Sequence, residues 1–239
     1  MSNFPFQRLQ ADLAKLIART PPGQRLLNEP DLSKQLGVSR ATLREAMRTF
    51  ETQGLIRRRQ GSGTYVVGKV PVMDAGLEEL ESIDRMARRM KLSISVSDLN
   101  IEQVNADREI AKQLGVKDGA RLTRVQRVIR VDRRPAAYLI DTLPESILKP
   151  DDLPSDFSGS VLDFLIARGD KLGVSRAVIS ATNAPADVAK PLEIQRDDVL
   201  LVFTAQLTDM LGKTVDYSTS YFIPGCFHFH VNRRVRNTN

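Results

Sequence analysis

Residues 25–66 read RLLNEPDLSKQLGVSRATLREAMRTFETQGLIRRRQGSGTYV, and this stretch decides the expected fold of the first third of the chain. It predicts a short helix, a turn, a second helix and a β-hairpin around a glycine-containing tip. Asn28 and Ser39 are placed to cap the two helices, and Gly37 is placed to end the first one. This order of elements is that of a winged helix-turn-helix, whose second helix enters the major groove of DNA.

The polar face of the second expected helix carries side chains suited to DNA. Hydroxyl groups and the N–H groups of a helix start bind phosphates, and an arginine can bond two acceptors on a guanine edge. The predicted DNA-binding residues are Ser39, Arg40, Thr42, Arg44 and Arg48 of the helix, with Arg59, Gln60, Gly61 and Gly63 of the hairpin. An arginine-rich helix alone is more often a solvated surface, but these parts in this order favour DNA binding.

The charge distribution supports the same prediction. Residues 1–70 contain 12 Lys and Arg against 5 Asp and Glu, whereas residues 71–239 contain 23 against 24. The net charges are therefore +7 and −1, which add to the +6 of the whole chain. The basic excess lies in the segment that is expected to neutralise phosphates.

Residues 6–67 resemble the winged-helix domain of the GntR family. The resemblance is carried by LGVSRATLREA at residues 36–46 and by RQGSGTYV at residues 59–66. The family usually has Ser-Glu-Arg-Glu-Leu where this chain has NEPDL at residues 28–32. The family's arginine commonly contacts DNA, so the resemblance implies that Pro30 removes one contact and that the operator can differ.

The chain is long enough for two domains. We expect a winged helix-turn-helix domain at residues 1–68, a linker at 69–77 and a second domain at 78–239. The second domain is predicted to be α+β with a largely antiparallel sheet. The expected helices are residues 78–90, 106–114, 160–168 and 185–193, and the expected strands are residues 92–96, 120–131, 136–142, 173–182, 198–209, 213–223 and 226–234.

An internal repeat with an offset of 78 residues runs through the second domain. AKQLGV at residues 111–116 corresponds to AKPLEI at residues 189–194, and each copy continues into a long strand, a tight turn and a return strand. We interpret the copies as two half-units whose sheets join around a common core or pocket. Chance similarity of two such units is the alternative.

This layout resembles the UTRA effector domain, a chorismate-lyase-like fold that follows the winged helix in the HutC/FarR-type branch of the GntR family. The resemblance covers about residues 76–234. It is carried by residues 130–136, 160–165, 174–181 and 212–221. It implies that the domain binds a small metabolite and forms a homodimer.

The same resemblance places Arg127, Ser160, Arg176 and Asp216 in the effector site. The arginines could pair with an anionic head group, Ser160 begins a helix whose N–H groups favour anions, and Asp216 could accept from a hydroxyl or amine. The alternative is that the arginines are solvated at strand edges and that Asp216 forms a salt bridge. Sugar-phosphate binders of the family have a second arginine and an acid on the returning strand, where this chain has Ile129 and Leu139.

These departures, together with the apolar segment FIPGCF at residues 222–227, suggest a pocket for a ligand with one anionic or polar end and a hydrophobic body. His228 and His230 share a strand face with each other, and such a pair binds metal only if a third ligand converges. Satisfied or exposed histidines are the expectation, so no metal or other cofactor is predicted.

Composition excludes several classes of protein. The single cysteine, Cys226, rules out internal disulfides and fits a cytoplasmic location. No apolar run reaches membrane length, and no signal sequence is evident. A catalytic constellation is lacking, because the chain has two histidines and neither a Gly-x-Ser-x-Gly motif nor a P-loop.

The hypothesis is therefore a homodimeric transcription regulator. It is predicted to be a repressor that binds a two-fold symmetric DNA operator and is released when a small-molecule effector binds the second domain. The alternatives are an architectural DNA-binding protein without an effector and an enzyme with a DNA-binding head.

Overall fold

A computed structural model describes residues 4–52, 54–59, 62–67, 72–155, 157 and 159–234. The chain forms two compact units, one of residues 1–72 and 224–226 and one of residues 73–223 and 227–239. Among the described residues, no helix is both long enough and apolar enough to cross a membrane.

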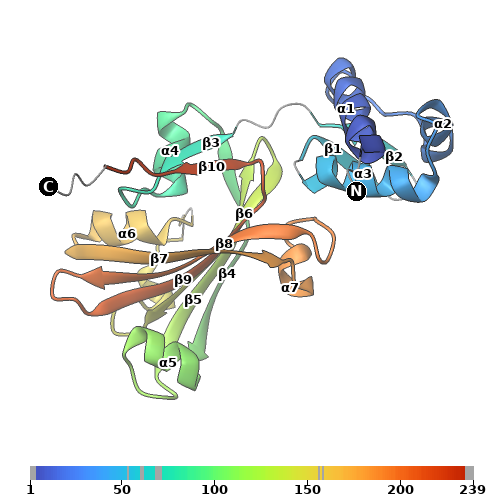
Figure 1. Cartoon of the computed structure of the whole chain (residues 1–239). Helices are drawn as coiled ribbons and strands as arrows, with labels where there is room; N and C mark the ends of the chain where they lie inside the picture. Colours follow the sequence, from blue (N-terminus) through green and yellow to red (C-terminus); the bar gives the residue numbers. More distant parts are fainter. Residues whose placement is uncertain are drawn as a thin grey trace, which may run out of the picture. The chain divides into compact units, whose positions relative to one another are not determined.

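The first unit consists of three helices and a two-stranded sheet. Helices α1 (Phe4–Arg19), α2 (Glu29–Gln35) and α3 (Arg40–Thr52) precede the antiparallel strands β1 (Ile56–Arg59) and β2 (Gly63–Val66) (Figure 1). Leu13 of α1, Leu32 of α2 and Leu43 of α3 are fully buried in one core. The apolar spacing of three and four residues therefore places one face of each helix inside, as the sequence predicts.

Local hydrogen bonds fix the ends of α2 and α3. Asn28 Oδ1 accepts the Asp31 backbone N–H at 2.9 Å, and Ser39 Oγ accepts the Thr42 backbone N–H at 3.1 Å. Gly37 has a φ of +65°, a left-handed conformation that follows the end of α2. The two predicted caps and the predicted helix stop are confirmed.

The second unit is built on one six-stranded antiparallel sheet in the order β4-β5-β6-β9-β8-β7. The strands are β4 (Ile94–Asn105), β5 (Arg121–Val131), β6 (Arg134–Pro144), β7 (Leu172–Asn183), β8 (Val199–Asp209) and β9 (Thr214–Phe222). The helices are α4 (Ile83–Arg89), α5 (Arg108–Leu114), α6 (Val161–Arg168) and α7 (Ala186–Ala189), with a 3-10 turn at Pro150–Asp152. The α+β prediction is confirmed.

The sheet order reproduces the internal repeat. The first half-unit is β4-α5-β5-β6 and the second is β7-α7-β8-β9, and they meet where β6 pairs with β9. Helices α5 and α7 occupy equivalent positions between the first and second strands of their halves. Two half-units thus form one continuous sheet, as the repeat predicts.

The two faces of this sheet carry different cores. On one face, Val125 and Leu143 pack with Val161 and Leu165 of α6. On the other face, Leu122 packs with Ala111 and Leu114 of α5. Figure 1 shows α4 and α6 on one side of the sheet and α5 on the other. Alternate residues of each strand therefore face either the α6 side or the α5 side.

A small parallel ribbon lies in the segment predicted to be linker. Strand β3 (Met73–Gly76) pairs in parallel with β10 (Phe227–His230), with Asp74 opposite His228. The expectation of an irregular linker through residue 77 is wrong for residues 73–76. Met73 and Ala75 are buried, but a four-residue strand whose partner lies 154 residues later leaves little periodicity in the sequence.

Other element boundaries also differ from the prediction, among them α7, which ends at Ala189 rather than 193, and β6, which runs from Arg134 to Pro144 rather than over 136–142. Helix α4 begins only at Ile83, because Ser82 caps it by accepting the Arg85 backbone N–H at 3.1 Å. Strand β4 continues to Asn105 past an irregularity between Ser97 and Asn100, and β10 ends at His230 rather than 234. Boundaries of this kind depend on caps and bulges that periodicity does not specify.

Candidate DNA-binding face and effector cavity

The exposed side of α3 carries the side chains predicted to contact DNA. Leu43, Ala46, Met47 and Phe50 are buried on the inner side of this helix. The residues exposed on its other side or at its N-terminus are Ser39, Arg40, Thr42, Arg44 and Arg48. The structure thus brings together all five residues that the sequence assigns to the recognition helix.

A carboxylate that the sequence analysis did not assign to DNA binding contacts this face. Arg44 Nε donates to Glu29 Oε2 at 2.7 Å, and Arg58 Nη2 lies 3.6 Å from Glu29 Oε1. Within the described part of the chain, only Nε of the Arg44 guanidinium has a partner, so its two terminal nitrogens can donate to the two acceptors of a guanine edge. Glu29 therefore orients Arg44 without occupying the donors needed for a base.

The hairpin is described only in part. Gln60 and Gly61 lie outside the described residues, and for Arg59 the structure describes the backbone alone, which pairs with Gly63. Gly63 has a φ of +113°, and a Cβ at this position would overlap the Arg25 guanidinium. A glycine is therefore favoured at position 63 by its backbone conformation, whereas the overlapping Arg25 guanidinium is the end of a long side chain that can shift.

The second unit contains a cavity of about 570 Å³ on the α6 side of the sheet. Arg127, Ser160 and Asp216 line it, so the structure brings together three of the four predicted effector residues. Arg176 is exposed on β7 between Ser175 and Ala177, which themselves line the cavity. Since neighbouring residues of a strand face opposite ways, Arg176 lies on the wrong face, and its assignment to the site is not supported.

A buried cluster of one cation and two acids forms the polar part of the cavity. Arg127 Nη1 donates to Asp141 Oδ2, and Asp216 Oδ1 accepts the Thr142 backbone N–H at 3.1 Å. Burial raises the pKa of Asp216 well above its usual value, and the charge of Asp141 and a hydrogen bond to it act in the same direction. Asp216 therefore keeps its proton to a higher pH than a free aspartate does, next to the Asp141 carboxyl group that pairs with Arg127.

Asp141 is a cavity residue, paired with Arg127, that the sequence alone did not point to. The expected position of the acid on the returning strand is occupied by Leu139, which pairs directly with Arg127. The acid lies two residues further along the same strand face, from where it reaches the guanidinium. The alternation of side chains along a strand places residues 139 and 141 on the same face. Only the pairing register of β5 and β6 shows that residue 141 reaches Arg127.

The described cavity wall carries more acidic than basic side chains. Among its described lining residues, Arg127 is the single cation, against the six acids Glu78, Glu79, Glu81, Asp84, Asp141 and Asp216. Burial raises the pKa of Asp84, the Asp163 charge adds to this, and Arg88 and Arg127 oppose it. This excess of acids disfavours the anionic head group that the sequence analysis allowed.

The remaining wall is apolar and aromatic. Phe203, Phe222, Phe227 and Phe229 all line the cavity, with neighbouring ring centroids 4.5–5.5 Å apart. This arrangement agrees with the expected hydrophobic body of a ligand. Ser160 caps α6 by accepting the Asp163 backbone N–H at 3.2 Å, so its hydroxyl already has one partner.

Helices α4 and α6 are connected beside this cavity. Ser82 Oγ donates to Asp163 Oδ2 at 2.6 Å, and Arg85 Nε lies 2.7 Å from Asp163 Oδ1. Asp163 thus joins the N-terminal parts of both helices, which carry Ser82 and Ser160 of the cavity wall.

Comparison with known proteins gives two family matches along the chain. The model of the bacterial regulatory proteins, gntR family, matches residues 6–66, and that of the UTRA domain matches residues 89–227. The HTH-type transcriptional regulator GgaR of Escherichia coli (strain K12) is 24% identical over 199 residues, 83% of this chain and 78% of that protein. A histidine utilization repressor of Pseudomonas putida is 27% identical over 184 residues, 76% of this chain and 72% of that protein.

A solved structure shares the fold. The crystal structure of PhnF from Mycobacterium smegmatis matches with a TM-score of 0.65 and 21% identity, covering 95% of this chain and 100% of that one. The crystal structure of its effector domain matches with a TM-score of 0.62 over 68% of this chain.

Proposed function

We propose that this chain, which belongs to the UTRA-domain family and to the GntR family of bacterial regulatory proteins, represses transcription from a two-fold symmetric operator until a small molecule binds its second unit. It is a ligand-responsive regulator of transcription and not an enzyme. Repression is the activity named for relatives that control histidine utilization, and we propose the same direction of control here.

DNA binding is assigned to the exposed face of α3 and to the hairpin. Arg40, Arg44 and Arg48 are exposed at spacings of four residues, and a helix of this kind fits the major groove. In this proposal Ser39 and Thr42 contact phosphates, and the residues from Arg59 to Gly63 steady the complex from the hairpin. Two such units, one from each protomer, would read the two half-sites.

The DNA-binding proposal is tested with duplexes selected from a random pool. Arg44→Ala is expected to weaken binding to the selected duplex by about 1–3 kcal/mol, because it removes a base contact. Arg19→Ala is the matched control, since it removes the same charge from an exposed position at the end of α1. Equal losses in the two variants would refute a base-reading role for Arg44.

The effector is proposed to carry a protonated amine or several hydrogen-bond donors on an apolar body. The observation that supports this class is the buried Arg127–Asp141–Asp216 cluster in a cavity lined by six acids and four phenylalanines. An added cation would lower the repulsion among these acids, whereas an added anion would increase it. Asp141 and Asp216 are the proposed acceptors.

The effector proposal is tested with matched pairs of small molecules. An arylalkylamine and the arylalkanoate of equal length are compared for their effect on the melting temperature and on DNA binding of the full chain. The amine is expected to stabilise the protein and to release the duplex. Stabilisation by the carboxylate or by sugar phosphates alone would refute the proposed class.

We propose a homodimer because the edge strand β7 offers a surface for a second copy, and a dimer would match the two-fold symmetric operator proposed above. This strand ends the sheet, and Val174 and Val178 on it are 70% and 54% exposed. Long exposed edges with apolar side chains are ready sites for pairing with another chain. Effector binding would then favour a dimer in which the DNA-binding units no longer match the operator spacing. As a regulator of transcription, the protein is proposed to act in the cytoplasm.

A further inference from the structure

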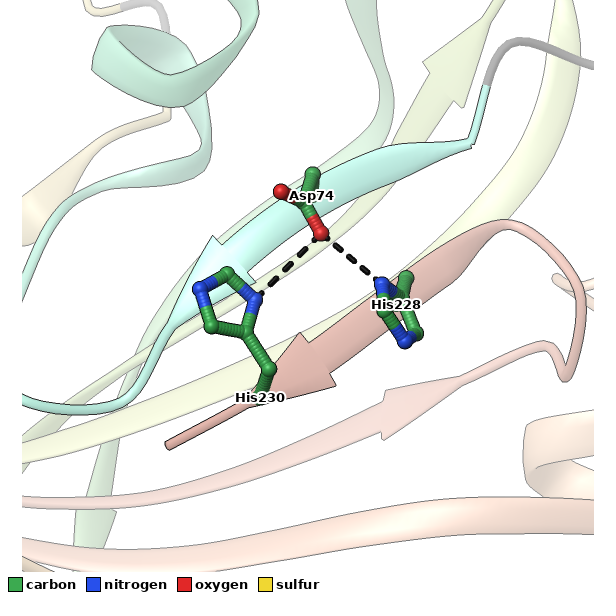
Figure 2. Close-up of side chains that lie close together, drawn as sticks. All are labelled: Asp74, His228 and His230. Carbon is green, nitrogen blue, oxygen red and sulfur yellow. Dashed lines mark hydrogen bonds and ion pairs between the residues drawn. The ribbon is translucent and has the colours of Figure 1, made fainter. Parts of the chain in front are cut away.

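Three side chains with metal-binding chemistry converge outside the effector cavity. Asp74 lies on β3, and His228 and His230 lie on its parallel partner β10. Figure 2 shows both imidazole rings turned toward the same carboxylate. His228 Nδ1 lies 2.9 Å and His230 Nδ1 lies 3.3 Å from Asp74 Oδ1.

We propose that Asp74, His228 and His230 form a binding site for one divalent transition-metal ion, with Zn²⁺ as the ion that suits the donors best. One donor atom from each residue lies within 4.8 Å of the others. Two imidazoles and one carboxylate form a common zinc ligand set, with water in the remaining position. This is the third ligand that the histidine pair lacked in the sequence analysis.

The two distances from Asp74 Oδ1 to the histidine nitrogens are close to those of a zinc site, and the two nitrogens lie within 4.8 Å of each other. Bonds of about 2.0–2.2 Å at tetrahedral angles place neighbouring ligand atoms roughly 3.3–3.5 Å apart. The two nitrogen–oxygen separations of 2.9 and 3.3 Å therefore need to change by only a few tenths of an ångström. The side chains of His228 and Asp74 are 72% and 55% exposed, which leaves room for a water ligand.

A further carboxylate lies beside one of the proposed ligands. A Cβ built on Gly76 would lie 2.7 Å from Glu78 Oε2 and 3.6 Å from His230 Nε2, so both atoms approach the same point of β3. His230 directs Nδ1 at Asp74, which leaves Nε2 on the side of Glu78. Metal-binding histidines usually donate their second ring N–H to a carboxylate, and Glu78 is the nearby carboxylate that we propose for this role.

Such an ion would join the two ends of the second unit. The ligands are separated by 154 residues in the sequence, so the ion would close a long loop and hold β3 against β10. The opposite side of the ribbon carries Ala75, Phe227 and Phe229, which line the cavity. An effect of the ion on effector binding would rest on the proposed effector cavity, whereas ion binding itself does not.

Zinc binding is tested by calorimetry on the full chain without an affinity tag, after removal of metals with a chelator. The parent protein is expected to bind one Zn²⁺ per chain, to give a visible absorption band with Co²⁺, and to show slower amide exchange in residues 73–76 and 227–230. Mg²⁺ is expected not to bind, because it prefers oxygen ligands. Lack of Zn²⁺ binding, or equal binding of Mg²⁺, would overturn the proposal.

Variants identify the ligands, since His228 and His230 are the two histidines of the whole sequence. Loss of a carboxylate that only hydrogen-bonds to a metal ligand typically weakens metal binding 10–100-fold, so loss of a direct ligand in Asp74→Asn, His228→Ala or His230→Ala should weaken it by at least about tenfold. Asp118→Asn removes one charge at a remote exposed position, and Cys226→Ser removes the thiol; both should bind as the parent does. Zn²⁺ binding that survives in the double histidine variant would place the ion elsewhere.

Discussion

Replacement of Asp216 by asparagine is expected to stabilise the protein without ligand. The Asp216 side chain is 6% exposed, and it accepts the Thr142 backbone N–H while lying against Asp141. Asparagine can accept the same N–H and donate its amide hydrogens to Asp141, as a protonated aspartate would. The variant keeps these hydrogen bonds and removes a group that resists ionisation in the folded protein.

The pH dependence follows from the direction of the shift. Burial and the neighbouring Asp141 raise the pKa of Asp216 above that of an unfolded aspartate, which is about 3.9. The folded protein therefore retains a proton that the unfolded chain releases, and stability falls as the pH rises above about 4. This loss of stability is complete once the pH exceeds the pKa of Asp216 in the folded protein. The Asp216→Asn variant does not show this loss, because asparagine does not ionise.

The magnitude is large enough to measure by thermal unfolding. Each unit by which the pKa is raised costs about 1.4 kcal/mol at pH values above the folded pKa. One kcal/mol corresponds to roughly 2–4 °C in the melting temperature of a protein of this size. We therefore expect the variant to melt several degrees above the parent at pH 8, with a difference that shrinks toward pH 4.

The assay is a series of melting curves from pH 4 to pH 8 for the parent, for Asp216→Asn and for Asp118→Asn. Asp118 is exposed, so its replacement controls for the loss of one negative charge. A melting temperature of Asp216→Asn that equals or falls below that of the parent at pH 8 would refute the description of Asp216 as a buried acid. So would a stabilisation that is independent of pH.

Three further outcomes are expected. Glu29→Gln should lower the ratio of specific to non-specific DNA affinity by about 1 kcal/mol in gel shifts, because Arg44 loses its orienting partner; an unchanged ratio would contradict this. Gly63→Ala should cost about 1–3 kcal/mol in thermal unfolding and weaken DNA binding, because a φ of +113° strains any residue that has a Cβ; an unchanged melting temperature would contradict this. Val178→Lys should shift the protein toward monomer in light scattering, whereas Leu211→Lys, at a 94% exposed turn, should not.

The sequence by itself determined the local elements of this protein. Helix caps at Asn28 and Ser39, the stop at Gly37 and the exposed arginines of α3 depend on residues at most four positions apart. Such interactions are encoded by spacing alone, and this is why α3 and its Ser39 cap were predicted from the sequence. The half-unit repeat was also visible, because each copy carries its own helix and hairpin.

Tertiary structure alone decided which distant side chains meet. The register of β5 and β6 brings Asp141 to Arg127, and the register of β3 and β10 brings Asp74 to His228. The same alternation turns Arg176 away from the cavity. A shift of one residue in strand pairing reverses the face of every side chain, so these contacts follow from long-range packing rather than from local sequence.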